Sequence, residues 1–208
     1  MGFSKVSYLD DLKKEIRFFD ERDDLDQHSG KFPGLSGSCA RVEFSDRNRE
    51  ELTKHFMKIK DNCEAILEIG VCRNNDRSST YSFLNNKNDD TVYIGIDIQD
   101  KSFLNNEEKN IHTMKVNSSN FQDVINFAKS KGVEKFDFIF IDGWHSINQV
   151  IDDWRYTELL SEGGIVGFHD VTRHPGPFYF FENLNTDKWE TTGNLSPEDN
   201  GIGFCWKK

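Results

Sequence analysis

The chain has 208 residues, the usual size of one domain with a full hydrophobic core. Acidic residues outnumber basic ones by 36 to 26, the formal net charge is −10 and the pI is near 5.1. Because this charge repels a phosphate backbone and the sequence contains no basic patch, we expect no nucleic-acid partner.

The cysteines and the hydropathy indicate a reduced, aqueous environment. Cys39, Cys63, Cys72 and Cys205 are scattered and form no CxxC pair, which is typical of reduced thiols and not of a disulfide framework or a zinc site. No stretch approaches the roughly 18 apolar residues of a membrane span, and residues 1–24 lack the apolar core of a signal peptide. We therefore expect a cytoplasmic protein with no membrane partner.

Residues 1–60 are expected to form N-terminal helices packed on the core. Apolar residues recur with helical spacing at Leu9, Leu12, Ile16 and Phe19. Residues 27–38 combine glycine and proline with two apolar side chains, which suits either a lid over an active site or an ordinary connector. Ser45 or Asp46 can cap a further helix that runs to about Lys60.

Residues 61–208 alternate apolar, strand-like runs with helical patterns. The expected strands are residues 64–70, 92–97, 111–116, 136–142, 164–169, 188–193 and 201–206. Such alternation favours an α/β fold with a doubly wound, mainly parallel, seven-stranded sheet, because parallel neighbours need long crossover connections. The last two strands lack an obvious helix between them, so they are expected to form a C-terminal antiparallel hairpin.

The first expected strand leads into a ligand-binding edge of this sheet. It contains Glu68 and ends at Gly70, and a polar loop and helix caps follow at residues 71–80. Backbone N–H groups and a carboxylate at a strand end commonly bind nucleotide-like cofactors. About 27 residues later the second strand ends at Asp97, whose carboxylate can accept hydrogen bonds from ribose hydroxyls.

A second cluster of polar residues follows the strand at residues 136–142. Asp142 ends this strand, and Trp144 and His145 follow in the loop. Ser146 can then cap a helix whose apolar face consists of Ile147, Val150, Ile151 and Trp154. Asp142 and His145 are therefore expected in a loop above the sheet, where they can meet a substrate.

The next strand delivers two more polar residues to the same edge. Gly163 and Gly164 are expected to end the preceding helix, and the buried strand after them ends at His169 and Asp170. Asp142, His169 and Asp170 could converge on one divalent cation, and the imidazole favours Mn²⁺ or Fe²⁺ over Mg²⁺.

Each of these side chains also has a purely structural interpretation. Asp142 could cap the next helix, Asp170 could form a turn, and His169 could be a buried, hydrogen-bonded histidine. Glu68 could hold loop amides without touching a ligand, and Trp144 could pack internally. Residues 174–179 are expected to form an aromatic loop, which could line an acceptor pocket or pack internally.

Together these motifs resemble the class I S-adenosylmethionine-dependent methyltransferases, which have a Rossmann-like fold. Within that class they are similar to the metal-dependent O-methyltransferases related to macrocin-type sugar methyltransferases and the cephalosporin-hydroxylase-like group. The resemblance runs from about Ala65 to the C-terminus. It depends on residues 68–73, 95–97, 141–146, 163–170 and 201–204, and the Asp-Gly-x-His-Ser element at residues 142–146 is the most specific.

The resemblance implies a role for each site residue. The Gly70 loop would hold the methionine part of the cofactor, Asp97 its ribose hydroxyls, and Asn117 and Ser118 the region near adenine. The remaining cofactor-binding residues would be Glu68, Val71, Ile98, Asp142 and Trp144. Asp142 and Asp170 would be metal ligands, and His145 would be the general base, with Asp142 the second catalytic residue.

Two departures from the family pattern concern the cofactor and the metal. Asn74 and Asn75 replace later glycines of the first loop, which leaves less room against the cofactor. His169 stands where relatives carry a second acid, which lowers the negative charge of the metal site.

The expected function is transfer of a methyl group from S-adenosylmethionine to a hydroxyl of a small molecule, assisted by Mg²⁺ or Mn²⁺. The alternatives are a metal-independent methyltransferase and a non-catalytic Rossmann-fold binding protein. An NAD-dependent oxidoreductase is disfavoured because the complete GxGxxG pattern is absent after the first strand. A homo-oligomer is compatible with the sequence.

Overall fold

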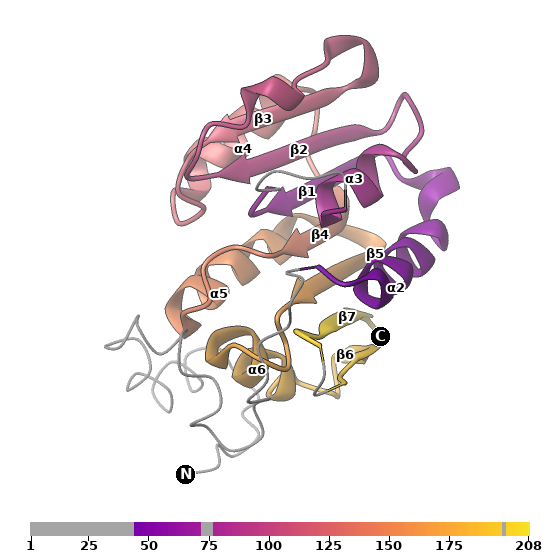
Figure 1. The fold of residues 1–208 in the computed structure, drawn as a ribbon. Coiled ribbons are helices and arrows are strands. Elements are labelled where there is room, and N and C mark those ends of the chain that lie inside the picture. The colour runs from indigo at the N-terminus through magenta and orange to yellow at the C-terminus, as the bar shows by residue number, and fades with distance from the viewer. Residues whose placement is uncertain (1–43, 72–76, 197–198) are drawn as a thin grey trace.

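One seven-stranded sheet organises the part of the chain that the computed structural model describes, residues 44–71, 77–196 and 199–208. Its strands are β1 (Ala65–Ile69), β2 (Val92–Asp97), β3 (Ile111–Lys115), β4 (Phe136–Ile141), β5 (Leu160–His169), β6 (Trp189–Asn194) and β7 (Ile202–Lys207). The spatial order is β3-β2-β1-β4-β5-β7-β6 (Figure 1). Strands β1 to β5 pair in parallel, and β7 runs antiparallel to both β5 and β6. The predicted doubly wound, Rossmann-like sheet with its antiparallel hairpin is confirmed.

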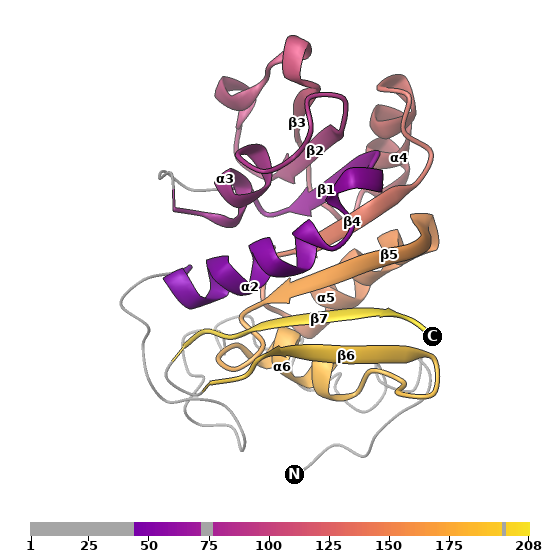
Figure 2. The same ribbon diagram turned by 90° about the vertical axis from the view of Figure 1, so that its right-hand side faces the viewer.

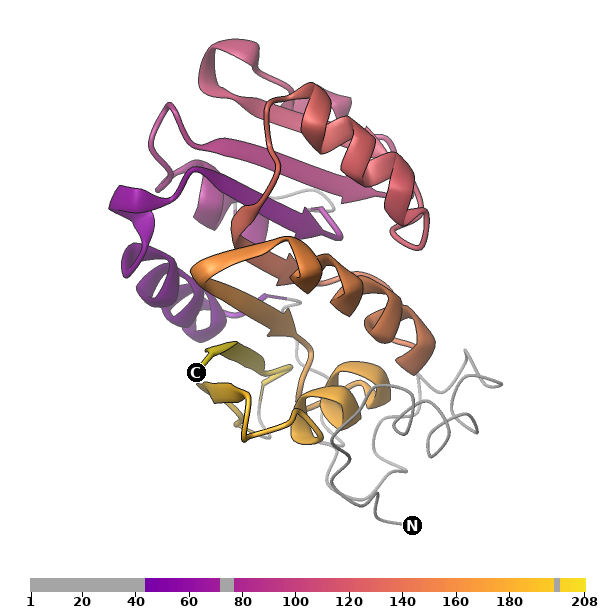
Figure 3. The same cartoon turned by 180° about the vertical axis from the view of Figure 1, so that it is seen from behind.

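Five α-helices in the described ranges cover the two faces of the sheet. They are α2 (Asp46–Met57), α3 (Ser79–Leu84), α4 (Phe121–Ser130), α5 (Ile147–Trp154) and α6 (Pro175–Glu182), with short 3-10 turns at Lys60–Asn62, Ser102–Leu104, Glu107–Lys109 and Arg155–Leu159. Helices α2 and α3 lie on one face (Figure 2), and α4, α5 and α6 on the other (Figure 3). None of these helices is long and apolar enough to cross a bilayer.

Helix starts agree with the capping signals in the sequence. The Ser45 hydroxyl accepts a hydrogen bond from the Asn48 backbone N–H at 3.1 Å, and α2 ends at Met57, three residues before the predicted end. The Ser146 hydroxyl accepts from the Gln149 backbone N–H at 3.2 Å. All four residues of the predicted apolar face of α5 are buried.

Gly163 and Gly164 do not end a helix, which corrects the expectation from the sequence. They lie inside β5, which begins at Leu160, directly after the 3-10 turn. Gly163 has a φ of +76°, and a Cβ on Gly164 would lie 3.0 Å from the Asp137 carbonyl oxygen. The pairing of β4 with β5 is irregular at this point, so the glycines permit a bulged start to a longer strand.

Residues 174–179, expected as a loop, form the N-cap and first turns of α6, which corrects the expectation. Tyr179 and the two residues after it, Phe180 and Phe181, are buried in the core on the α5 face of the sheet. Internal packing therefore describes the end of the segment, and its expected place at an acceptor pocket stays a prediction for its start. The apolar spacing predicted for residues 8–22, the loop 27–38, and Asn74 and Asn75 lie outside the described residues.

Candidate active site

Loops at the carboxyl ends of β1 and β4 touch through their backbones at Gly70. Gly70 has a φ of +86°, and a Cβ there would lie 2.0 Å from the Asp142 carbonyl oxygen. The Gly70 N–H donates to the Ile96 carbonyl at 2.9 Å, and the Asp142 N–H donates to the Ile69 carbonyl at 2.8 Å. Only glycine combines this backbone angle with such a close approach.

Asp97 lies where the sequence predicted it, at the carboxyl end of β2. Its Oδ2 accepts from the Val71 backbone N–H at 3.0 Å, and its Oδ1 accepts from the Gln99 backbone N–H at 2.7 Å. The neighbouring Ile98 is 68% exposed. Asp97 therefore ties the first loop to the second strand at the edge where a cofactor is expected.

Asn117 and Ser118 follow β3, and their polar groups contact the chain locally and α5. Asn117 Oδ1 accepts from the Ser119 backbone N–H at 2.9 Å, and Gln149 Nε2 donates to Ser118 Oγ at 2.9 Å. Trp144, in the loop after β4, is 52% exposed, so the alternative of internal packing does not describe it. An exposed indole beside a strand end is available for a ring or an apolar ligand group.

Glu68 points away from this loop edge and is fully buried. Side chains alternate along β1, so Glu68 faces α3. Its carboxylate accepts hydrogen bonds from the Ser79 hydroxyl, at 2.5 Å, and from the Tyr93 hydroxyl. Burial raises the pKa of Glu68 to about 7. In the structure Glu68 therefore holds α3 against the sheet, and its expected place among the cofactor contacts stays a prediction.

Asp142, His169 and Asp170 come together as the sequence predicted, with one ligand atom from each within 4.8 Å of the others. His169 Nδ1 lies 3.1 Å from Asp142 Oδ1 and 3.2 Å from Asp170 Oδ2. Burial lowers the pKa of His169, but the two carboxylates outweigh burial and hold it well above its ordinary value. His169 Nδ1 is thus hydrogen-bonded to Asp142 and forms an ion pair with Asp170.

Asn48 on α2 fixes the other side of the His169 ring. Its amide Nδ2 lies 3.2 Å from His169 Nε2 and donates to Asp199 Oδ1 at 3.1 Å. Its Oδ1 accepts from Asn194 Nδ2 at 3.2 Å. The sequence analysis missed Asn48, whose only signal is its position one turn after the cap of α2.

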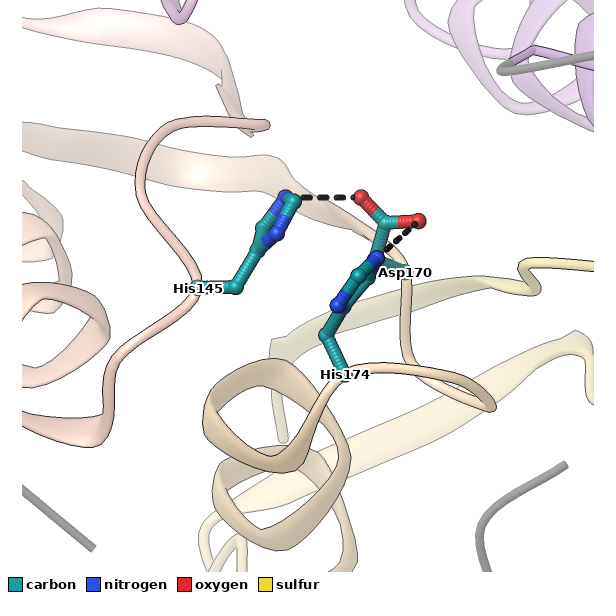
Figure 4. A group of neighbouring side chains, drawn as sticks. All are labelled: His145, Asp170 and His174. Atoms are coloured by element: carbon teal, nitrogen blue, oxygen red, sulfur yellow. Dashed lines mark ion pairs between the residues drawn. The ribbon is translucent and has the colours of Figure 1, made fainter. Parts of the chain in front are cut away.

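His145 pairs with Asp170 and not with Asp142. His145 Nε2 lies 2.9 Å from Asp170 Oδ2, and His174 Nε2 lies 3.8 Å from Asp170 Oδ1 (Figure 4). The rings of His145 and His174 stack with their centroids 4.0 Å apart. Burial raises the pKa of Asp170, but the imidazoles of His169 and His145 outweigh burial and hold this pKa well below its ordinary value.

His174 is a second residue that the sequence analysis missed as a member of the site. It is the N-cap residue of α6, four positions after Asp170. The signal in the sequence is a histidine directly before a proline, a few residues after His169 and Asp170. From the sequence, we interpreted this segment only through its aromatic rings.

A family of proteins described as "methyltransferase domain" matches residues 67–171. This range is just over half of the chain and includes Asp97, Asp142, His145 and Asp170. The chain belongs to this methyltransferase family. No curated protein matches the sequence of this methyltransferase.

Two solved structures show the same fold as this methyltransferase. The O-methyltransferase from Bacillus cereus in complex with SAH is 16% identical with a TM-score of 0.55, and the alignment covers 97% of this chain and 98% of that chain. MycE from the mycinamycin biosynthetic pathway, in complex with Mg, SAH and mycinamycin VI, is 15% identical with a TM-score of 0.56. That alignment covers 76% of this chain and 48% of MycE, so the chain matches about half the length of MycE.

Proposed function

We propose that this methyltransferase transfers a methyl group from S-adenosylmethionine to a hydroxyl of a small-molecule acceptor. The observation that supports this most directly is the His145–Asp170 pair, an imidazole held 2.9 Å from a buried carboxylate at the carboxyl edge of the sheet. Proton removal is what an acceptor hydroxyl requires during methyl transfer.

The proposed cofactor site lies at the carboxyl ends of β1, β2 and β4. Gly70 and Val71 would face the methionine part of the cofactor, Asp97 and Ile98 the ribose, and Asn117 and Ser118 the adenine region, with Trp144 and Asp142 beside them. The exposed side chains of Ile98 and Trp144 support this proposal, since they leave apolar surface for the cofactor at this edge. The two neighbouring structures that contain SAH support it as well.

His145 is the proposed general base. Asp170 orients its ring through Nε2 and stabilises the imidazolium that forms when the ring accepts a proton. The methyl group is already activated by the sulfonium, so the protein has to align the acceptor oxygen and remove its proton. Asp142, expected as the second catalytic residue, lies against His169, which also contacts Asp170, and Asp170 in turn contacts His145.

Metal assistance is part of the proposal. Two carboxylates and an imidazole within 4.8 Å fit a divalent ion, Mn²⁺ better than Mg²⁺, and such an ion would lower the pKa of a coordinated hydroxyl. In the structure His169 Nδ1 is hydrogen-bonded to Asp142 and forms an ion pair with Asp170, so this nitrogen must lose its proton before it can become a ligand.

The test is a pair of variants with opposite expected effects. His145→Gln should lower turnover by about 10² to 10⁴-fold, the usual contribution of a general base, with little change in the affinity for S-adenosylhomocysteine. Asp97→Asn should weaken that affinity by about tenfold or more. The neutral amide is a weaker acceptor than the carboxylate, both for the Val71 backbone N–H and for the ribose hydroxyls that would bind there.

Calorimetric titration of S-adenosylhomocysteine, with NAD as the control ligand, measures the affinity. A methyl-transfer assay over a panel of hydroxylated acceptors measures turnover. Binding of S-adenosylhomocysteine without turnover on any acceptor would favour the non-catalytic binding protein. The reverse pattern of variant effects would contradict the assigned roles.

A further inference from the structure

We propose that His145, Asp170 and His174 form a binding site for a divalent transition-metal ion of the Mn²⁺, Fe²⁺, Co²⁺ and Zn²⁺ class. The inference refines the metal requirement of the proposed function. It rests on the proposed function only for the role of the ion in catalysis. It replaces His169 and Asp142, expected from the sequence, by two imidazoles on the other side of Asp170.

Three separate segments bring the ligand atoms together. His145 comes from the loop after β4, Asp170 from the end of β5, and His174 from the start of α6 (Figure 4). The nitrogen–oxygen distances are 2.9 Å for His145 and 3.8 Å for His174, and the three ligand atoms lie within 4.8 Å of one another. Ligands about 2.1 Å from one ion lie roughly 3 to 4 Å apart, so small shifts suffice for coordination.

One oxygen of Asp170 supplies independent evidence for a ligand at this position. Asp170 is 4% exposed, and within the described residues its Oδ1 has no hydrogen-bond partner. A buried carboxylate oxygen without a hydrogen bond costs free energy unless a cation or a donor satisfies it. Oδ1 is the oxygen that faces His174 Nε2, so the unsatisfied atom lies between the proposed ligands.

The two sets share Asp170 but use different sides of its carboxylate. On the side of the alternative set, Asp142 Oδ1 and Asp170 Oδ2 both face His169 Nδ1, and Asn48 lies against the opposite ring nitrogen. A cation there would displace the His169 proton and break a buried network that includes Asn48, whereas a cation on the other side would displace only the proton between His145 Nε2 and Asp170 Oδ2. A cation on the His174 side meets a carboxylate oxygen without a hydrogen bond and two imidazoles.

The ligand types define the class of metal. Mg²⁺ prefers oxygen ligands in octahedral geometry, whereas imidazole nitrogen suits Mn²⁺, Fe²⁺, Co²⁺ and Zn²⁺. Two imidazoles and one carboxylate on one side of an ion leave further positions for water or an acceptor oxygen. Bound there, the ion would lower the pKa of that oxygen. His145 would then be a ligand when the ion is bound, and the general base only in the protein without the ion.

The backbone holds this arrangement in place. The Gly176 N–H on α6 donates to the His145 carbonyl at 3.0 Å, and a Cβ at Gly176 would lie 2.1 Å from that oxygen. The loop of His145 and the first turn of α6 are therefore in direct backbone contact. Each imidazole is mostly buried, with 16% of the His145 and 12% of the His174 side chain exposed.

The experiment is calorimetric titration of the full chain with Co²⁺, Mn²⁺ and Mg²⁺ in turn, without cofactor or acceptor. We expect Co²⁺ to bind more tightly than Mn²⁺, and Mg²⁺ at least tenfold more weakly than either. His174→Gln should weaken Co²⁺ binding at least tenfold. His112→Gln, which alters a buried histidine on β3 outside the cluster, is the matched control and should leave binding unchanged.

Two results would overturn the proposal. One is that the unaltered chain binds Mg²⁺ as tightly as Co²⁺ or more tightly. This comparison requires no variant. The other is unchanged Co²⁺ binding in His174→Gln together with its loss in Asp142→Asn, which would place the ion on the His169 side. Titration of S-adenosylhomocysteine into the same samples separates the two hypotheses, because the proposed function requires that binding and the metal site does not.

Discussion

Asp170 contacts three imidazoles, which makes it the most connected residue of the candidate site. Its Oδ2 lies 2.9 Å from His145 and 3.2 Å from His169, and its Oδ1 lies 3.8 Å from His174. The residue has a φ of +61°, a left-handed angle that aspartate tolerates better than most residues. This backbone angle turns the chain from β5 toward α6 and leaves one carboxylate facing both neighbouring loops.

Glu68 is the residue whose ionisation should affect stability most clearly. Burial raises its pKa to about 7, while the pKa in the unfolded chain is about 4.3. Between these values the folded protein binds a proton that the unfolded chain has lost. The free energy of unfolding should therefore fall as the pH rises from about 4 to about 7, by on the order of 3 kcal/mol from this group. Asp153, whose pKa burial also raises to about 7, contributes in the same direction.

Urea unfolding of the unaltered chain and of Glu68→Gln at pH 5 and pH 8 measures this effect. The loss of stability between the two pH values should be smaller in Glu68→Gln, because the amide does not ionise. Equal losses in the two proteins would show that Glu68 titrates normally.

At the scale of elements, the start of α6 determines where His174 lies. Gly176 sits in the first turn of α6 and touches the His145 backbone, while Phe180 and Phe181 anchor the rest of the helix in the core. The position of α6 relative to the loop after β4 therefore depends on one residue without a side chain.

Gly176→Ala should move the first turn of α6 away from His145, because the added Cβ would lie 2.1 Å from the carbonyl oxygen. We expect a loss of about 1 to 3 kcal/mol in the free energy of unfolding and at least tenfold weaker Co²⁺ binding. Glu182→Ala, at an exposed position of the same helix, is the control and should change stability by less than about 0.5 kcal/mol. Wild-type metal binding in Gly176→Ala would contradict this account of α6.

At the scale of the whole molecule, a buried polar network joins α2 to the C-terminal strands and to the site. Asp199 accepts from Ser45 Oγ at 2.5 Å, from Asn48 Nδ2 at 3.1 Å and from Asn194 Nδ2 at 3.3 Å. Asn48 also contacts His169. Ser45 and Asp199, 154 positions apart in the sequence, thus belong to one network that holds the His169 ring.

Asp199→Ala should lower the free energy of unfolding by about 1 to 3 kcal/mol or more, because it leaves buried donors without an acceptor. Chemical denaturation measures the change, and Asp187→Ala at an exposed position is the control. A change no larger than that of Asp187→Ala would show that the network is not a major contact of α2 with the sheet.

The sequence by itself determined the fold class, most of the elements and the strand ends at which the candidate site lies. The strand at residues 136–141 is an apolar run with Asp137 as its single polar residue, and Ser146 is a local cap followed by an amphipathic helix, so short-range periodicity and capping were sufficient. Asp97, Asp142, His145 and Asp170 follow strand ends, and parallel strands bring such ends to one edge. The family resemblance rested on these same local motifs.

Only the tertiary structure decided which side chains pair with which. His145 meets Asp170, Glu68 contacts Ser79 on α3, and Gly163 and Gly164 lie inside a strand. Asn48 and His174 join the site through contacts that no local pattern encodes. The physical reason is that a hydrogen bond or an ion pair tolerates changes of only a few tenths of an ångström in the distance between its two atoms. When these atoms come from distant segments, packing of the whole sheet and its helices sets that distance.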